Sequence, residues 1–93
     1  METSSGFEFE FDRQRLDDMR VVELLCDVTD EKLDDFTRLC AIGRLIELLL
    51  GKAQKAALYE HIGASHEGRV PYRALEEELA EIMNSAGEDA EKN

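Results

Sequence analysis

The chain of 93 residues has no tryptophan, a single proline and only 6% aromatic residues. Sandwiches and barrels of β-strands draw on β-branched and aromatic residues and on frequent turn residues. Aliphatic residues and alanine instead supply most of the 43% hydrophobic fraction, and this balance favours helices. A chain of this length forms one small domain that buries about 60% of the surface its unfolded form exposes.

The sequence also lacks an uninterrupted apolar run long enough to cross a membrane. Its most apolar stretch, residues 36–50, is interrupted by Arg38, Arg44 and Glu47, whereas about 20 predominantly apolar residues are needed to span a bilayer. The apolar residues of this stretch lie around most of a helix, which predicts a helix enclosed by other elements. The first residues contain no basic region followed by an apolar one, so we expect no secretion signal.

Basic residues are scarce relative to acidic ones. The chain has 11 lysines and arginines against 22 aspartates and glutamates, a net charge of −11. Such a charge repels the phosphates of nucleic acids and the headgroups of anionic membranes. We therefore expect no direct contact with nucleic acid and no membrane binding. The acidity has three alternative explanations: it keeps the protein soluble, it attracts a basic partner, or it mimics the charge of DNA.

Residue types that carry chemistry are few. Cys26 and Cys40 fall inside apolar helical patterns and form no CxxC pair, so we expect buried free thiols and no zinc or redox motif. His61 and His66 are five residues apart across Gly63, a spacing that does not place both on one helical face. No nucleophile motif or glycine-rich phosphate loop accompanies them. The sequence therefore predicts no enzyme, no cofactor and no bound metal.

Hydrophobic spacing predicts four helices joined by short connections. They cover residues 18–28, 31–50, 52–62 and 71–83. Asp17 is the expected N-cap of the first, Gly51 is expected to end the second in the left-handed conformation, and Pro71 suits the first position of the last. These elements predict an all-α fold, a small four-helix bundle-like domain.

The segment from Phe7 to Phe11, F-E-F-E-F, alternates apolar and acidic residues, as a half-buried strand does. The other strand-like piece is Arg69-Val70 in the loop before the last helix, so a short β contact between the two is predicted. A disordered arm whose phenylalanines order on binding is the alternative. Residues 7–83 form the predicted single helical domain, between a disordered N-terminus at 1–6 and a disordered acidic tail at 84–93.

Several short motifs follow one another in a distinctive order. They are Leu16-Asp17-Asp18-Met19, Val22-Glu23-Leu24-Leu25, Leu48-Leu49-Leu50-Gly51, Gln54-Lys55, Glu60-His61-Ile62, Glu67-Gly68-Arg69-Val70-Pro71 and Glu77-Glu78-Leu79. Their order and spacing, from Phe9 to Met83, resemble the small tail assembly chaperones of long-tailed (siphovirus-type) bacteriophages and prophages. These proteins are encoded between the major tail protein and the tape measure protein.

The resemblance implies a non-enzymatic protein of the host bacterial cytoplasm. It would bind the long, aggregation-prone tape measure protein during tail morphogenesis and help to recruit tail subunits. The family also makes a longer product by a backward ribosomal slip near the stop codon. Glu91-Lys92-Asn93 can be encoded GAA AAA AAC, which contains a heptamer that permits such a slip, and synonymous codons would remove it.

On this interpretation the client contacts apolar residues that remain once the core is filled. The candidate partner-binding residues are Leu45, Leu48 and Tyr59 on the helices and Phe7, Phe9 and Phe11 on the assisting arm. A helix-in-groove contact would cover apolar stripes on the client, and the negative exterior would keep the complex soluble. The alternative is that these residues belong to the core.

Two other functions fit the composition. An acidic inhibitor that mimics DNA would display carboxylates in two rows at phosphate spacing, but basic residues such as Arg13, Arg20 and Lys52 are interleaved with the acidic ones. Salt-sensitive competition with DNA for a DNA-binding enzyme would identify such an inhibitor. A subunit of a helical homo-oligomer would instead show a large mass in light scattering.

Overall fold

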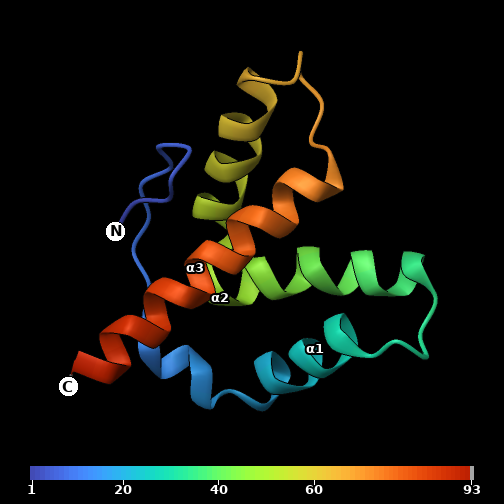
Figure 1. Ribbon diagram of the computed structural model, residues 1–93, viewed down its shortest axis with the longest axis vertical. Helices are drawn as coiled ribbons and strands as arrows, with labels where there is room; N and C mark the ends of the chain where they lie inside the picture. Colours follow the sequence, from blue (N-terminus) through green and yellow to red (C-terminus); the bar gives the residue numbers. More distant parts are fainter. Residues whose placement is uncertain (93) are drawn as a thin grey trace.

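The computed structural model describes the backbone of residues 1–92 and the side chains of residues 1–85. Its elements are a 3-10 turn, η1 (Arg13–Asp17), and three helices, α1 (Met19–Thr29), α2 (Asp35–Ala64) and α3 (Tyr72–Lys92) (Figure 1). No strand occurs among these residues, so the predicted all-α class is confirmed. In the part of the chain that the structure describes, every helix is too short or too polar to cross a membrane.

The long helix α2 turns a corner at Gly51, whose φ of 86° and ψ of 163° are not helical. In Figure 1 the green half before Gly51 and the yellow half after it run in clearly different directions. The predicted second and third helices therefore correspond to the two halves of α2 on either side of Gly51, and no loop separates them. The positive φ expected at Gly51 is present, but its ψ lies outside the left-handed helical region, so the glycine makes a corner without a loop.

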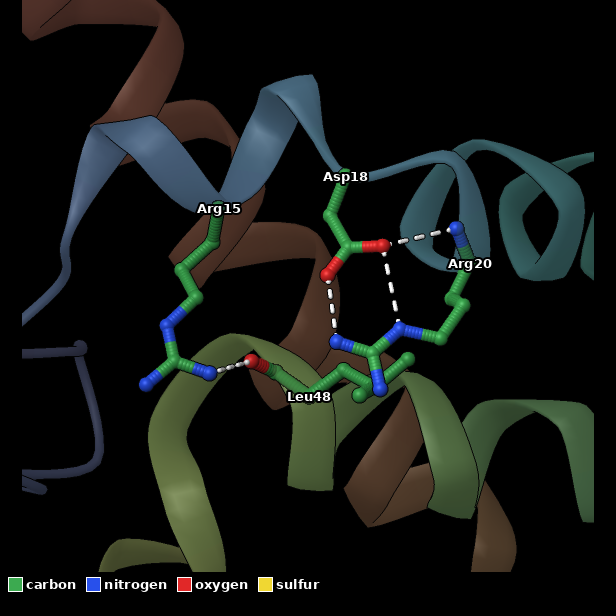
Figure 2. A network of polar contacts seen from close by, with 4 residues as sticks. All are labelled: Arg15, Asp18, Arg20 and Leu48. Carbon is green, nitrogen blue, oxygen red and sulfur yellow. Dashed lines mark hydrogen bonds and ion pairs between the residues drawn. The ribbon is translucent and has the colours of Figure 1, made fainter.

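Two carbonyls in the last turn before the corner accept hydrogen bonds from side chains. Nη1 of Arg15 donates to the carbonyl oxygen of Leu48 at 2.8 Å (Figure 2). Nε2 of Gln54 donates to the carbonyl oxygen of Leu50, also at 2.8 Å. Side chains from η1 and from the second half of α2 thus satisfy the carbonyls at the end of the first half, and Arg15 fastens η1 to α2.

The starts of α1 and α2 differ from the prediction because a neighbouring aspartate takes the capping position. Asp18, not Asp17, caps α1 and accepts a hydrogen bond from the N–H of Arg20 at 2.9 Å; the Arg20 side chain pairs with the same carboxylate (Figure 2). Asp34 caps α2 by accepting from the N–H and the hydroxyl of Thr37. Residues 31–34 therefore form a connection, not the helical turn expected there.

The last helix, α3, follows Pro71 directly. The Pro71 carbonyl accepts from the N–H of Leu75, which makes Pro71 the N-cap and not the first helical residue as predicted. Leu75, Leu79 and Ile82 then form the buried stripe. The disordered tail predicted at 84–93 stays a prediction: α3 continues to Lys92, and Asn93 and the side chains from residue 86 onward lie outside the described residues.

The core surrounds α2. Its most deeply buried side chains are Val21, Leu45, Ile46, Leu58 and Ile82, which come from all three helices. Phe7 and Phe9 of the N-terminal segment belong to the same cluster. From Ala41 onward the apolar residues of the stretch 36–50 are buried or partly buried against other elements, as its composition predicted, whereas Phe36 and Cys40 at its beginning are exposed.

The N-terminal arm, residues 1–11, lies beside the second half of α2 (dark blue in Figure 1). Its only β pairing among the described residues is an isolated bridge between Glu2 and Glu8, so the predicted β contact with Arg69-Val70 is wrong. The period-two pattern still places Phe7 and Phe9 inside, because the arm packs one face on helices instead of on a strand. Disorder at residues 1–6 stays a prediction; in this conformation Thr3 is 5% exposed.

Both cysteines are exposed free thiols, so their predicted burial is wrong. On α1 the sequence offers two neighbouring apolar stripes, and only one of them faces α2. The stripe with Val21 is buried, whereas Met19 and Val22, on the same face as Cys26, are exposed. Periodicity alone does not choose between two stripes on one helix.

Candidate functional site

An open apolar groove lies between the end of α1, the beginning of α2 and α3. It has a volume of about 570 Å³. Its apolar lining consists of Val28, Leu39, Ile42, Leu79, Ala80 and Met83, and its remaining residues are Asp35, Arg38, Tyr72 and Glu76. Leu39 and Ile42 are one turn apart on α2, as are Leu79 and Met83 on α3, so each helix contributes a ridge to the groove.

The charged residues of the groove leave it slightly negative. Nε of Arg38 donates to the carbonyl oxygen of Val28 at 3.3 Å, and its Nη1 lies 3.8 Å from the carboxylate of Asp35. These contacts hold the guanidinium at the end of α1 and offset its charge. Glu76 forms no ion pair among the described side chains. An apolar segment that carries a basic residue would therefore complement the groove.

One exposed aromatic side chain lines the groove: Tyr72 is 52% exposed. Phe36, which follows the lining residue Asp35 in the sequence but does not itself line the groove, is 77% exposed. Large exposed aromatic residues beside an apolar groove are typical of protein interfaces. Phe36 is also the sequence feature that could have indicated this region, because it begins the most apolar stretch and yet stays outside the core.

The six residues predicted from the sequence to bind a partner lie away from this groove. Phe7, Phe9 and Leu45 are buried in the core, and Phe11, Leu48 and Tyr59 are partly buried against it. None of the six lines the groove. Their role stays a prediction, but in this conformation Phe7, Phe9 and Leu45 present almost no surface to a partner.

Tyr59 occupies a distinct setting on the second half of α2. Burial raises the pKa of its phenol above the usual 10.0, and the negative charge of Glu47 raises it further. Nζ of Lys55 lies 5.6 Å from the centre of the ring. The phenol oxygen also lies close to Gly43, where an added Cβ would be 3.5 Å from it. Tyr59 therefore packs between the two halves of α2.

A second polar site holds the N-terminal arm, and we call it the cradle: Gln54 and His61 of α2 with Glu78 and Glu81 of α3. The N–H and the hydroxyl of Ser4 donate to the two oxygens of Glu81 at 2.9 and 3.0 Å. The hydroxyl of Ser5 donates to Oε1 of Glu78, and its oxygen lies 3.0 Å from Nε2 of His61. Both serines thus fasten the arm to α3.

The other end of the arm is held through its backbone. The N–H of Glu10 donates to Oε1 of Gln54 at 2.7 Å, and Nε2 of Gln54 donates to the carbonyl of Glu10 at 2.9 Å. Between the two ends, the rings of Phe7 and Phe9 are stacked with centroids 6.1 Å apart, and Phe7 also contacts His61. The cradle therefore holds a hairpin-like segment by its backbone, its hydroxyls and two aromatic rings.

The grouping of Ser5, His61 and Glu78 differs from a hydrolytic triad. In such a triad the histidine bridges the nucleophile and the acid. Here Ser5 is the bridging residue, because it contacts both partners. The arrangement suits attachment of the arm and does not prepare the serine for nucleophilic attack.

No protein-family model matches the chain, and neither does any curated protein or solved structure. The groove, the charge and the order of the sequence motifs are therefore the features that bear on function.

Proposed function

We propose that this protein is a tail assembly chaperone of a long-tailed bacteriophage or prophage, which binds the tape measure protein in the host cytoplasm and helps to recruit tail subunits. The observation that carries the proposal is an open apolar groove on a domain with a net charge of −11. The order of motifs from Phe9 to Met83 supports the choice of family.

The groove suits an amphipathic helix of the client. Its volume of about 570 Å³ accommodates several apolar side chains presented by successive turns of one helix. Each large side chain that leaves water there contributes about 1.5–3 kcal/mol. The uncompensated Glu76 favours clients with a basic residue at the edge of the apolar stripe.

The acidic exterior completes the mechanism. A client with long apolar stripes aggregates because the stripes of different copies meet. Once a stripe lies in the groove, the complex presents a strongly negative surface, and like charges keep complexes apart. Binding and solubilisation therefore come from separate parts of the same small domain.

The proposal includes the longer, frameshifted product. Its predicted slip site encodes Glu91-Lys92-Asn93, which lies outside the residues whose side chains the structure describes. The codons at these positions and a tape measure gene immediately downstream would support this part of the proposal. Codons that contain no slippery heptamer would contradict the second product without affecting the groove.

The groove is tested by filling it. Ala80 is exposed and lines the groove, so Ala80→Trp blocks it without disturbing the core. Ala57→Trp, at an exposed position outside the groove, is the matched control. Co-expressed tape measure fragments from the same phage should stay soluble with the wild type and with Ala57→Trp, and should bind Ala80→Trp at least about tenfold more weakly. Equal binding to all three variants, or no binding to the wild type, would refute the proposal.

A further inference from the structure

Glu78 is a buried carboxylate whose hydrogen-bonding capacity is half unused. Its residue is 5% exposed and its Oε1 accepts from Ser5, but Oε2 has no partner among the described residues. The ion pairs found among those residues, Arg20–Asp18 and Arg38–Asp35, do not involve it. A buried charge without a full set of donors is costly. The cradle therefore lacks a donor that its present occupant, the arm, does not provide.

The arm is an imperfect occupant in a second respect. It brings Glu2, Glu8 and Glu10 to a domain that is already strongly acidic. The arm forms a small hairpin of its own: Glu2 and Glu8 form an antiparallel bridge, and the N–H groups of Thr3 and Phe9 donate to the carbonyls of Phe7 and Met1, each at 2.9 Å. Its polar bonds to the cradle join residues 44 to 77 positions apart. A partner segment of the same hairpin shape would find the same donors and acceptors in the cradle.

We propose that the cradle is a binding site for a hairpin-like segment of a partner polypeptide, and that the arm is the resident occupant which this segment displaces. The segment carries a lysine or arginine at the position of Ser5, followed by aromatic residues at the positions of Phe7 and Phe9. The basic side chain donates to Oε2 of Glu78 and neutralises the buried charge. The aromatic rings replace the stacked phenylalanines, and Gln54 binds the backbone.

This site is separate from the proposed client groove. On α3, Glu78 and Glu81 lie on the side of the helix opposite to Glu76, Ala80 and Met83. A negative result in the experiment on one site therefore does not contradict the proposal for the other.

The experiment compares three peptides by fluorescence anisotropy, each labelled at its C-terminus. One has the sequence of the arm, METSSGFEFEF, and the others carry lysine or glutamate in place of Ser5. They are titrated with the full-length wild type, with Glu78→Gln and with Glu77→Gln, whose substituted residue is an exposed neighbour of the same charge. The lysine peptide should bind the wild type at least about tenfold more tightly than the arm peptide, and the glutamate peptide more weakly. Glu78→Gln should remove this preference and Glu77→Gln should keep it.

Three results would overturn the inference: equal affinity for the three peptides, a preference that survives Glu78→Gln, or no binding at all. If the arm peptide binds best and the protein alone forms concentration-dependent dimers, the occupant is a second copy and the basic partner is excluded. Should Glu78→Gln fail to fold, full-length Ser5→Lys supplies a second measurement. It should slow hydrogen exchange at the amides of Phe7, Phe9 and Glu10 about tenfold relative to the wild type, and faster exchange would overturn the assignment.

Discussion

Arg15 closes the end of a helix that is not its own: its Nη1 donates to the carbonyl oxygen of Leu48 at 2.8 Å, just before the corner at Gly51 (Figure 2). A charged side chain thus donates to a backbone carbonyl in the last turn before the corner. The same contact ties η1 to α2 and so fixes where the N-terminal segment joins the helical core.

Replacing Arg15 by alanine removes this bond. Arg15→Ala should lower the free energy of unfolding by about 1 kcal/mol, because the Leu48 carbonyl returns to water and η1 loses an attachment. Arg13→Ala, in the same turn, should change it by less than about 0.5 kcal/mol. Urea denaturation followed by circular dichroism measures both, and equal effects would show that the Leu48 contact contributes nothing of its own.

Gly43 and Gly51 of α2 should respond to alanine in opposite directions. Gly51 has φ 86° and ψ 163°, a region essentially restricted to glycine, and its Cβ would meet nothing within 4 Å. Gly51→Ala should therefore cost about 1–3 kcal/mol through backbone strain alone. Gly43 lies inside a helical half, where alanine is favoured by up to about 1 kcal/mol and a Cβ would make an ordinary contact with Tyr59. Thermal melts of both variants test this, and a stabilised Gly51→Ala would contradict the strain.

A substitution of Leu45 distinguishes a role in the core from a role in client binding. Leu45 is completely buried, so Leu45→Ala should lower the free energy of unfolding by about 2–5 kcal/mol, and any loss of client binding should follow unfolding. The partly buried Leu48 should be less sensitive. If Leu45→Ala stays as stable as the wild type but loses the client, Leu45 is a contact residue, as the sequence suggested.

The aspartates that cap α1 and α2 should make the stability of the fold depend on pH in acid. Hydrogen bonds from the Arg20 side chain and backbone hold the pKa of Asp18 at about 2, below its ordinary 3.8. The N–H and hydroxyl of Thr37 likewise lower the pKa of Asp34. Because folding lowers both pKa values, the ionised caps stabilise the fold above the unfolded pKa, and this contribution is lost as the pH falls from about 4 to about 2.

The midpoint of thermal unfolding, measured across that range, should therefore fall for the wild type. It should fall less steeply for Asp18→Asn, since asparagine still caps α1 but does not titrate. The control Asp17→Asn changes a neighbouring carboxylate that caps no helix, and its curve should follow the wild type. Parallel curves for all three proteins would exclude the contribution of the Asp18 cap.

Local features of the fold could be predicted because they depend on residues near in sequence. The alternation of Phe7 and Phe9 with glutamates indicated which side of the arm is buried, and Gly51 indicated where the long helix changes direction. Neither pattern identifies what lies opposite. Period two appears wherever one face of an extended chain is covered, so it did not distinguish the helices that hold the arm from the strand expected at Arg69-Val70.

The groove and the cradle could not be predicted from the sequence, for a related reason. Leu39 and Met83 have the periodicity of core residues, and only the arrangement of three helices shows that they line an open groove. The cradle combines Ser4 with Glu81, 77 positions away. Its least expected member is Glu78, one of four glutamates between residues 76 and 81, because the sequence does not show that the arm lies beside it.

The attachment of the arm also sets an order of events during translation. Ser5 is made 73 residues before Glu78, and Ser4 is made 77 residues before Glu81. The hairpin of α1 and the first half of α2 can form as soon as it emerges, since its contacts are close in sequence. The arm and its two buried phenylalanines must wait until α3 has left the ribosome, so the nascent chain carries an exposed aromatic segment for most of its synthesis.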